Sequence, residues 1–318
     1  MKGKIKRMVM RTLFALLMLI AFTKVYFEVD NYYYESGLIS MKKAQELDAE
    51  VQGEIEYKTL SLKGCEIHYS ISKNKSEKSI VFLHPAFSDH TVFQEQFDYF
   101  SKDYTVIAID LIGHGLSKAN KSKDKIDASR DHIFKILELE NIEKTNLLGV
   151  SVGSLIAQHF ALKYPEKVNS LTALGGYDIN KENEEIAKSQ KFSNIGLVIR
   201  ALFSMRAFRK KTAMITCKSK RGQALFYQST RHYTRSSFAT MQGLQNVIKN
   251  RETHEASYPI LIMTGEFDID LAKRMAESWH SELENSEYFM IEDAGHCANL
   301  DKPADFNRKV KDFLDRNN

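Results

Sequence analysis

A serine between two glycines occupies the place of a nucleophile. The segment 149–153 reads GVSVG, after an apolar run at 145–150 and before a helical stretch at 154–164. A sharp turn from strand to helix leaves no room for side chains two residues before and two after its centre, which explains both glycines. Such a turn exposes the serine at a helix N-terminus, where N–H groups stabilise negative charge. The pattern predicts Ser151 as a nucleophile, and an ordinary glycine turn is the alternative.

A serine hydroxyl needs a base to take its proton and an acid to orient that base. Asp268 and His296 come later in the chain, each in a loop just after an apolar, strand-like run. Parallel strands end at one edge of a sheet, where such loops meet. We therefore predict Asp268 as the acid and His296 as the base. Glu266 and Asp293 are competing acids, and a helix N-cap role for Asp268 or a surface-loop role for His296 is the structural alternative.

The negative charge of a tetrahedral intermediate needs two backbone N–H donors, which form an oxyanion hole. Val152, the residue after the serine, is expected to supply one. The loop after the strand ending at Leu83 is expected to supply the other from Ala86, because Pro85 has no N–H. His84 in the same loop is interpreted as structural, with hydrogen bonds inside the loop.

Alternating strand-like and helix-like segments must position these residues. Two alternating runs, 55–62 and 65–71, predict an antiparallel hairpin around Lys63-Gly64. Other apolar runs have the length of buried strands, with helical patterns between them. The runs are 79–83, 105–109, 145–150, 168–174, 260–263 and 288–291, and the main helical patterns are 131–139, 155–164, 271–280 and 306–314. This order predicts the α/β class, with a mostly parallel central sheet flanked by helices.

The interval 177–258 interrupts the alternation and is mostly helical in pattern, so we expect a helical cap inserted into the sheet domain. The predicted organisation is a membrane anchor or signal segment at 1–27, a linker or helical stalk at 28–52, a catalytic domain at 53–176 and 259–318, and the cap at 177–258.

The first 27 residues have a membrane-targeting pattern. Five basic residues precede an apolar run, and no acid occurs before Glu28. The uncharged stretch from Thr12 to Thr23 is short, but snorkelling of Arg11 and Lys24 extends it to the roughly 20 residues that a bilayer needs. We expect an N-terminal transmembrane helix with the catalytic domain on the extracytoplasmic side. A cleaved signal peptide is the alternative, although no small-x-small site follows the run.

Composition excludes several other classes. The 318 residues, 43% of them hydrophobic, can bury a core without disulfides or metals. Cys65, Cys217 and Cys297 lie far apart with no Cys-x-x-Cys pair, so neither a disulfide framework nor a metal site is expected. The sequence has no phosphate loop or dinucleotide fingerprint, so we expect no cofactor and no nucleic-acid partner.

The predicted cap is strongly basic. Between Ile186 and Arg251 there are 14 Lys and Arg residues and no Asp or Glu. Ile195, Val198, Ile199 and Leu202 share a helical face close to several of these cations, an arrangement typical of helices on anionic membranes. It favours a lipid or other hydrophobic ester as substrate and the membrane as a partner of the cap. The alternative is that the basic cap docks on an acidic catalytic domain.

These motifs together resemble the α/β-hydrolase superfamily over residues 55–313. The segment 110–117 resembles its D-x-x-G-x-G-x-S loop, in which His114 is interpreted as structural, and the AGH motif at 294–296 resembles its terminal histidine block. The resemblance implies a serine esterase or lipase-like enzyme with a Ser-Asp-His triad. Pro85 departs from the family, which usually has glycine there. Serine at position 151 disfavours the dehalogenases and epoxide hydrolases, whose nucleophile is aspartate.

The sequence therefore predicts hydrolysis of carboxylic esters, lipid or acylglycerol esters among them, through an acyl-enzyme intermediate. Two alternatives stay open. An aminopeptidase-type amide hydrolase would need acidic cap residues for the substrate's amine, and the stretch 186–251 has none. A ligand sensor could keep the same triad and turn over very slowly.

Overall fold

A computed structural model describes residues 2–45, 54–120, 123–181, 196–249 and 256–317. Its centre is an eight-stranded sheet in the order β1-β2-β4-β3-β5-β6-β7-β8. The hairpin β1–β2 is antiparallel and β2 pairs antiparallel with β4, whereas all the other neighbours are parallel. The strands are β1 Ile55–Leu62, β2 Cys65–Ser72, β3 Ser79–Leu83, β4 Thr105–Ile109, β5 Thr145–Val150, β6 Val168–Leu174, β7 Ile260–Gly265 and β8 Ser286–Ile291. The predicted fold class is confirmed.

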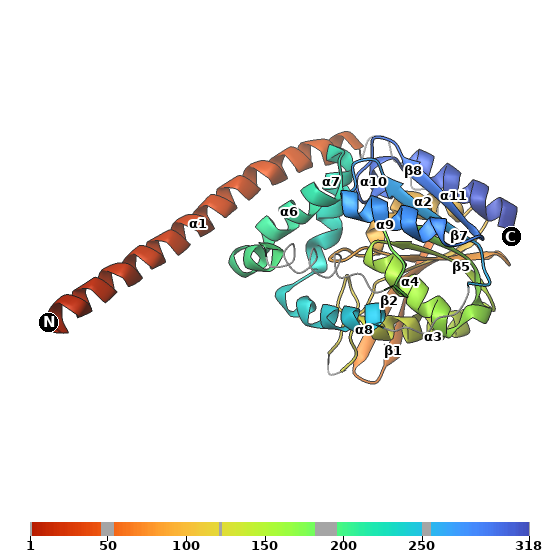
Figure 1. Ribbon diagram of the computed structural model, residues 1–318, viewed down its shortest axis with the longest axis horizontal. Helices are drawn as coiled ribbons and strands as arrows, with labels where there is room; N and C mark the ends of the chain where they lie inside the picture. Colours follow the sequence, from red (N-terminus) through yellow and green to blue (C-terminus); the bar gives the residue numbers. More distant parts are fainter. Residues whose placement is uncertain (1, 46–53, 121–122, 182–195, 250–255, 318) are drawn as a thin grey trace.

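Helices cover both faces of the sheet (Figure 1). On one face α3, α4 and α9 bury residues such as Ile133 and Phe160 against one core cluster. On the other face α2 and α11 bury Phe97 and Phe313 in a second cluster. Burial on both faces explains why β3, β4 and β5 are continuous apolar runs. The helices are α2 Gln94–Phe100, α3 Ser129–Leu139, α4 Val152–Lys163, α9 Asp270–Ser281, α10 Ala298–Asp301 and α11 Pro303–Asn317, with 3₁₀ helices η1 His90–Phe93, η2 Ile126–Ala128 and η3 Pro165–Lys167.

The described part of the segment between β6 and β7 is mostly helical from residue 196 to residue 249. It lies beside the sheet domain, between the sheet and α1 (Figure 1). Residues 196–203 are helical, and the named elements are α6 Met205–Thr216, α7 Lys220–Ser229, η4 Thr230–His232, η5 Arg235–Gly243 and α8 Leu244–Lys249. We keep the word cap for this segment. The expected cap residues 182–195 and 250–255 lie outside the described residues.

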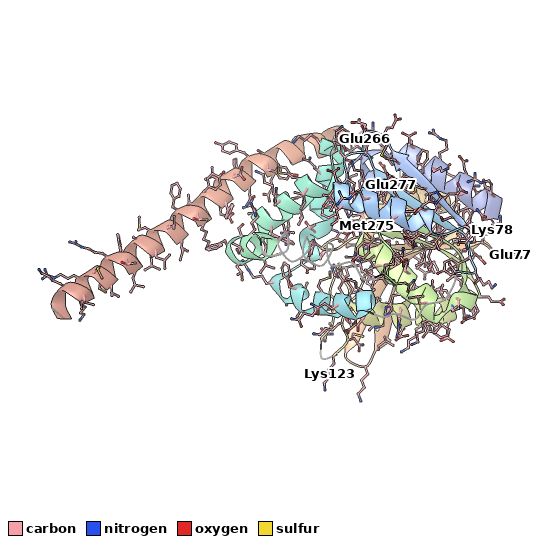
Figure 2. The ribbon with its side chains drawn as sticks, viewed as in Figure 1. Glu77, Lys78, Lys123, Glu266, Met275 and Glu277 are labelled. Carbon is pink, nitrogen blue, oxygen red and sulfur yellow. The ribbon has the colours of Figure 1, made fainter. Side chains whose placement is uncertain are left out.

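The chain begins with one helix, α1 Lys2–Gln45, of 44 residues. Its stretch Lys4–Gly37 contains an 18-residue window with a mean hydropathy of 1.8, and the helix is long and apolar enough to cross a membrane. No part of this window is buried inside the protein, which excludes a core helix and fits an anchor or signal sequence. Figures 1 and 2 show its first half projecting into open space. The expected boundary between anchor and linker at 27/28 lies inside this helix, and residues 46–53 lie outside the described residues.

Candidate active site

Ser151 stands at a strained turn between β5 and α4. Its φ of 52° and ψ of −119° lie in a region of backbone conformation that residues other than glycine rarely adopt. Its N–H donates to the Leu174 carbonyl at 2.7 Å, which ties the turn to the end of the neighbouring strand β6. Strain of this kind is retained where the surrounding structure fixes it, and it is common at functional sites. The ordinary glycine turn is therefore a poorer description of this segment.

The two glycines around Ser151 lie against backbone. A Cβ on Gly149 would come within 2.4 Å of the Gly153 carbonyl, and one on Gly153 would come within 1.9 Å of the Leu83 carbonyl oxygen. Neither distance can be tolerated, so α4 crosses the ends of β5 and β3 this closely only because both residues lack a side chain. Ser151 therefore lies at the carboxyl ends of β5 and β3, on the same edge of the sheet.

Asp268 and His296 come together across two loops. The His296 Nδ1 atom lies 2.9 Å from both carboxylate oxygens of Asp268. The Asp268 side chain is fully buried, whereas that of His296 is 22% exposed. Asp268 is not the N-cap of α9, because that position belongs to Ile269 and Asp268 accepts the Ile269 N–H at 2.8 Å.

The competing acids face other partners. Glu266 accepts the backbone N–H of Asp293 at 2.8 Å. The Asp293 carboxylate forms ion pairs with Lys218 and Lys302 on the surface. Neither acid has a hydrogen bond to His296, so the buried partner of the histidine is Asp268.

The environment of His296 favours its protonated form. Burial by itself lowers the pKa of the imidazole, but the charge and hydrogen bond of Asp268 outweigh it and raise the pKa to about 9. An imidazolium beside a buried carboxylate is the state a general base reaches after taking a proton. The contact between His296 and Asp268 therefore suits a histidine that holds a proton.

Ser151 and His296 line the same cavity of about 240 Å³. No hydrogen bond joins the Ser151 hydroxyl to the His296 ring in this structure, although both residues are described. Such bonds are often loose without substrate and tighten in the complex. The fold therefore brings the three predicted residues to one place, with the His296–Asp268 contact formed.

Ala86 and Val152 also line this cavity. Neither N–H donates to a backbone carbonyl in the part of the chain that the structure describes. Next to Ala86, Phe87 has a φ of 72°, a left-handed conformation that bends the loop. Two N–H groups from opposite walls, one of them at the start of α4, are an arrangement suited to a developing oxyanion.

His84 and His114 stabilise the loops behind the cavity. The His84 Nε2 atom accepts the Leu111 N–H at 2.9 Å, and its Nδ1–H donates to the Pro85 carbonyl at 2.8 Å. These bonds join the loop after β3 to the loop after β4. His114 is fully buried against the His84 and Tyr233 rings, and burial lowers its pKa to about 3. Both histidines are structural, as the sequence predicted.

The loop after β4 is organised by Asp110. Its carboxylate accepts the backbone N–H and the Nδ1–H of His90, each at 2.8 Å, and the Leu116 N–H at 2.8 Å. Burial raises the pKa of Asp110, but the bond to His90 outweighs it and the pKa falls to about 2. A Cβ on Gly115 would lie 2.2 Å from the carboxylate, so glycine is required there. This explains the glycine-rich pattern of the segment.

Much of the cavity wall comes from residues that the sequence analysis did not identify. The cap and α9 supply most of the wall, and the side chains are chiefly apolar: Leu197, Thr212, Ile215, Thr216, Phe226, Ile269, Leu271, Ala272 and Met275. Figure 2 labels Met275 on α9. The spacing of these residues matches ordinary amphipathic helices, so no local signal separates a cavity wall from core packing.

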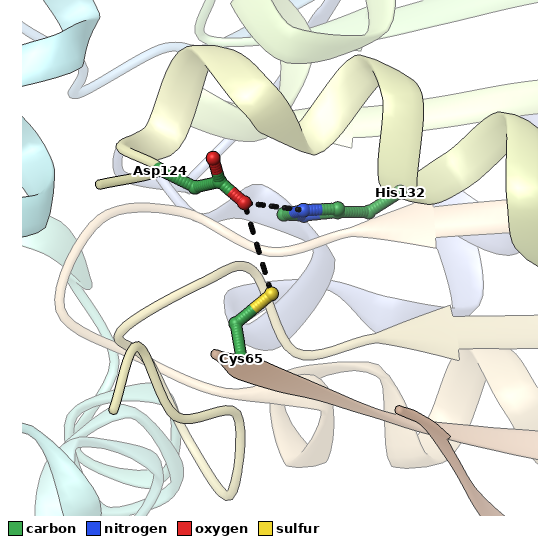
Figure 3. Close-up of side chains that lie close together, drawn as sticks. All are labelled: Cys65, Asp124 and His132. Atoms are coloured by element: carbon green, nitrogen blue, oxygen red, sulfur yellow. Dashed lines mark hydrogen bonds and ion pairs between the residues drawn. The ribbon is translucent and has the colours of Figure 1, made fainter. Parts of the chain in front are cut away.

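Among the described residues, two clusters have side chains of the types that bind metals. Cys65, Asp124 and His132 lie together, with Asp124 Oδ2 3.8 Å from the thiol sulfur and 3.7 Å from His132 Nε2 (Figure 3). His68, His90 and Asp110 form the other cluster. These donor types suit zinc. The sequence spacing did not reveal either cluster, and none of their members lines the cavity of Ser151.

Comparisons with known proteins agree with this architecture. A family model described as the alpha/beta hydrolase fold matches residues 78–303. The 3-oxoadipate enol-lactonase 2 of Acinetobacter baylyi is 21% identical over 266 residues, which cover 82% of this chain and 97% of that protein.

Solved structures show the same fold at low identity. A membrane phospholipase A, described as a bacterial virulence factor, has a TM-score of 0.67 at 19% identity, covering 96% of this chain and 98% of its own. A thermophilic esterase from Thermogutta terrifontis has a TM-score of 0.67 at 18% identity, covering 83% of this chain and 98% of its own. Since the family model matches well over half of its length, the chain belongs to the alpha/beta hydrolase family.

Proposed function

We propose that this protein is a serine hydrolase that cleaves carboxylic esters of hydrophobic substrates through an acyl-enzyme, with Ser151, His296 and Asp268 as its triad. One observation carries the proposal. A strained strand-to-helix turn presents Ser151 to an apolar cavity that also exposes the ring of a histidine held by a buried carboxylate. Membership of a hydrolase family supports the same chemistry.

The reaction follows from the positions of these groups. Ser151 Oγ attacks the ester carbonyl while the His296 ring takes its proton. The N–H groups of Ala86 and Val152 stabilise the oxyanion that forms. His296 then gives the proton to the leaving alcohol. Water, activated by the same histidine, attacks the acyl-enzyme, releases the acid and restores the serine.

Asp268 acts through the histidine. Its two oxygens, each 2.9 Å from Nδ1, keep that nitrogen protonated, so Nε2 is the atom left to accept the serine proton. Its charge stabilises the imidazolium that forms during attack. Burial of the carboxylate keeps water from screening this interaction.

The cavity wall favours an apolar acyl group over a free amine. None of the described residues that line the cavity is acidic, so none of them would pair with the amine of a peptide substrate. Apolar side chains such as Leu155, Leu197 and Phe226 would pack against hydrocarbon. This favours ester hydrolysis over the aminopeptidase alternative.

A membrane location would supply such a substrate. α1 fits an anchor by length and composition, and the basic residues before its apolar run favour an extracytoplasmic catalytic domain. A membrane phospholipase A shares the fold over nearly the whole chain, which supports a lipid ester as the substrate class. We therefore extend the proposal to hydrolysis of lipid or acylglycerol esters at a membrane surface.

The test compares the full chain in detergent micelles with its Ser151→Ala variant on p-nitrophenyl esters and monoacylglycerols of increasing chain length. We expect hydrolysis by the parent protein and its loss in the variant, with a fall of about 10⁴-fold or more. Ser281→Ala, which changes an exposed serine at the end of α9, is the matched control and should keep full activity.

Labelling by a fluorophosphonate separates the enzyme from the sensor. Labelling that depends on Ser151 together with measurable turnover supports the esterase. Labelling with no turnover on any ester would favour the slow-turnover sensor, and no labelling at all would contradict Ser151 as the nucleophile.

A further inference from the structure

Helix α1 is attached to the cap through one short stretch. Glu28 accepts hydrogen bonds from the Ser204 hydroxyl at 3.1 Å and from the Arg206 guanidinium at 2.9 Å. Two helical turns further along α1, Glu35 accepts two more N–H groups of the same arginine. The two acids therefore hold Arg206 between them. We call residues 28–35 of α1 the brace.

The rest of the brace contacts the same two cap helices. Asp30 forms an ion pair with Lys210 at 2.6 Å. Asn31 is 1% exposed and its amide lies 3.5 Å from the Ser204 hydroxyl. Tyr34 packs edge-on against Tyr227, with ring centres 5.5 Å apart, and the Tyr227 hydroxyl donates to Glu35. Burial of an amide and several ion pairs distinguishes this contact from a loose linker.

The cap helices that hold the brace also form the cavity wall. On α6, Arg206 and Lys210 face α1, whereas Thr212, Ile215 and Thr216 line the cavity. On α7, Tyr227 contacts the brace and its neighbour Phe226 lines the cavity. On both α6 and α7, the same helix carries residues that contact α1 and residues that line the cavity. A shift of α1 relative to the cap would therefore move the cavity wall.

Four cations of the cap form ion pairs inside the molecule. Arg206 and Lys210 pair with α1, and Arg221 and Lys218 pair with Glu95 and Asp293 of the catalytic domain. This favours the docking alternative of the sequence analysis over attraction of these cations to lipid headgroups. Apolar side chains offer the cap a second means of contact with a membrane.

Such side chains are present on the helix at 196–203. Its inner face buries Leu197 and Ala201, and Leu197 lines the cavity. Its outer face leaves Val198, Ile199 and Leu202 exposed by 40%, 50% and 66%. Three large apolar residues side by side on one face are costly in water.

The position of this helix identifies what covers that face. Ser204, one residue past its end, is bonded to Glu28, which is the first acid after the apolar run of α1. Since a helix rises 1.5 Å per residue, Glu28 and Asn31 lie within about 6 Å of Phe27, the residue just before the first acid of α1. Interfacial helices bury their apolar faces about 5–10 Å deep at the headgroup boundary. If α1 spans a bilayer, its interface lies close to Ser204 and thus close to the exposed face.

We infer that the outer face of helix 196–203 inserts into the membrane interface beside α1, and that the brace holds it there. The occupant is the bilayer that α1 enters, because the exposed face and the brace are continuous with that helix. The inner face of the same helix lines the cavity through Leu197. An ester in the outer part of the bilayer thus has a short apolar route to Ser151.

The test places a bimane label on Leu202→Cys in the full chain, reconstituted in phosphatidylcholine–phosphatidylglycerol vesicles with or without brominated acyl chains. The three native cysteines are buried and should not react. We expect brominated lipid to reduce the fluorescence at least about twofold. Leu139→Cys is the control, because it is a leucine with 57% exposure on α3, on the part of the molecule away from α1.

Quenching at position 202 but not 139 supports the inference. Equal quenching of both labels by aqueous iodide, with no effect of brominated lipid, would overturn it. Ile199→Cys gives a second position if Leu202→Cys does not fold. The same measurement in a Ser151→Ala background needs no catalysis, so its result is separate from that of the esterase proposal.

The role of the brace is tested in the labelled protein. Glu35→Gln combined with Arg206→Gln removes the central ion pair. We expect brominated-lipid quenching at position 202 to fall towards the level of the Leu139 control. Arg308→Gln, which removes an exposed ion pair with Asp305, should leave quenching unchanged. Unchanged quenching in the brace variant would show that helix 196–203 docks without the brace and would contradict that half of the inference.

Discussion

The sheet domain and the cap position the same cavity in different ways. In the sheet domain, backbone fixes the site: strand ends, two glycines and a strained serine leave the chemical groups little freedom. In the cap, side chains fix the site through ion pairs and aromatic contacts with α1 and the catalytic domain. Backbone packing permits few alternatives, whereas partly exposed ion pairs can be exchanged at small cost. The site therefore combines a rigid centre with an adjustable cavity wall.

The largest expected effect lies in the rigid centre. Asp268→Asn removes the charge that stabilises the His296 imidazolium and permits the wrong tautomer, so kcat should fall by about 10³- to 10⁴-fold. The control is Asp293→Asn, which changes an exposed acid with lysine partners and should alter kcat less than about twofold. Steady-state hydrolysis of a p-nitrophenyl ester measures both. Equal losses in the two variants would contradict the assignment of Asp268.

The pH dependence tests the same centre. His296 must be neutral to act as the base, and its pKa is raised to about 9, so kcat/KM should rise about 50-fold between pH 7 and 9 and level off above about pH 10. The stability of the fold changes with pH in the opposite direction. The raised pKa stabilises the fold fully below the ordinary value of 6.5, and this contribution is lost as the pH rises through 9.

The rate of the Ser151→Ala variant is subtracted from that of the parent protein at each pH. The difference gives the pH profile of kcat/KM. In Asp268→Asn the plateau should begin at lower pH, because burial alone lowers the pKa of His296. A plateau reached already near pH 6.5 in the parent protein would contradict the influence of Asp268 on the histidine.

A pair of glycine substitutions compares the two regions directly. Gly153→Ala places a methyl group 1.9 Å from the Leu83 carbonyl, so it should destabilise the fold by about 3 kcal/mol or more. Gly196→Ala in the cap has its nearest atom 3.7 Å away and should change stability by less than about 1 kcal/mol. Thermal unfolding in detergent measures both. Similar melting temperatures for the two variants would remove the distinction between rigid centre and adjustable wall.

The smallest expected effect is in the brace. A double-mutant cycle of Glu35→Gln and Arg206→Gln should give a coupling energy of about 1 kcal/mol, because the pair is partly exposed but bidentate. The exposed pair of Lys311 and Asp315 on α11 is the control and should give about 0.4 kcal/mol. Urea unfolding of the full chain in detergent measures both cycles. A coupling energy no larger than that of the control would show that the brace adds no specific stability.

The sequence by itself determined the strands and the order of the chemical motifs. The predicted bounds of β3, β4, β5 and β6 match the structure, because strands buried on both faces must be continuous apolar runs. The strands β7 and β8 are longer than predicted, since pairing between them extends to polar residues such as Ser286 and to Gly265. The serine turn was predictable because its steric requirement falls on residues next to it in the chain.

Only the tertiary structure decided which side chains surround the serine and which residues of the cap contact α1. Arg206 and Glu35 are 171 residues apart in the sequence, and nothing in the local pattern of either helix shows that they meet. The cavity wall likewise comes from helices whose amphipathic spacing serves any core equally well. Local periodicity determines which face of an element is buried, whereas the partner of that face depends on contacts between distant segments, which form only in the folded chain.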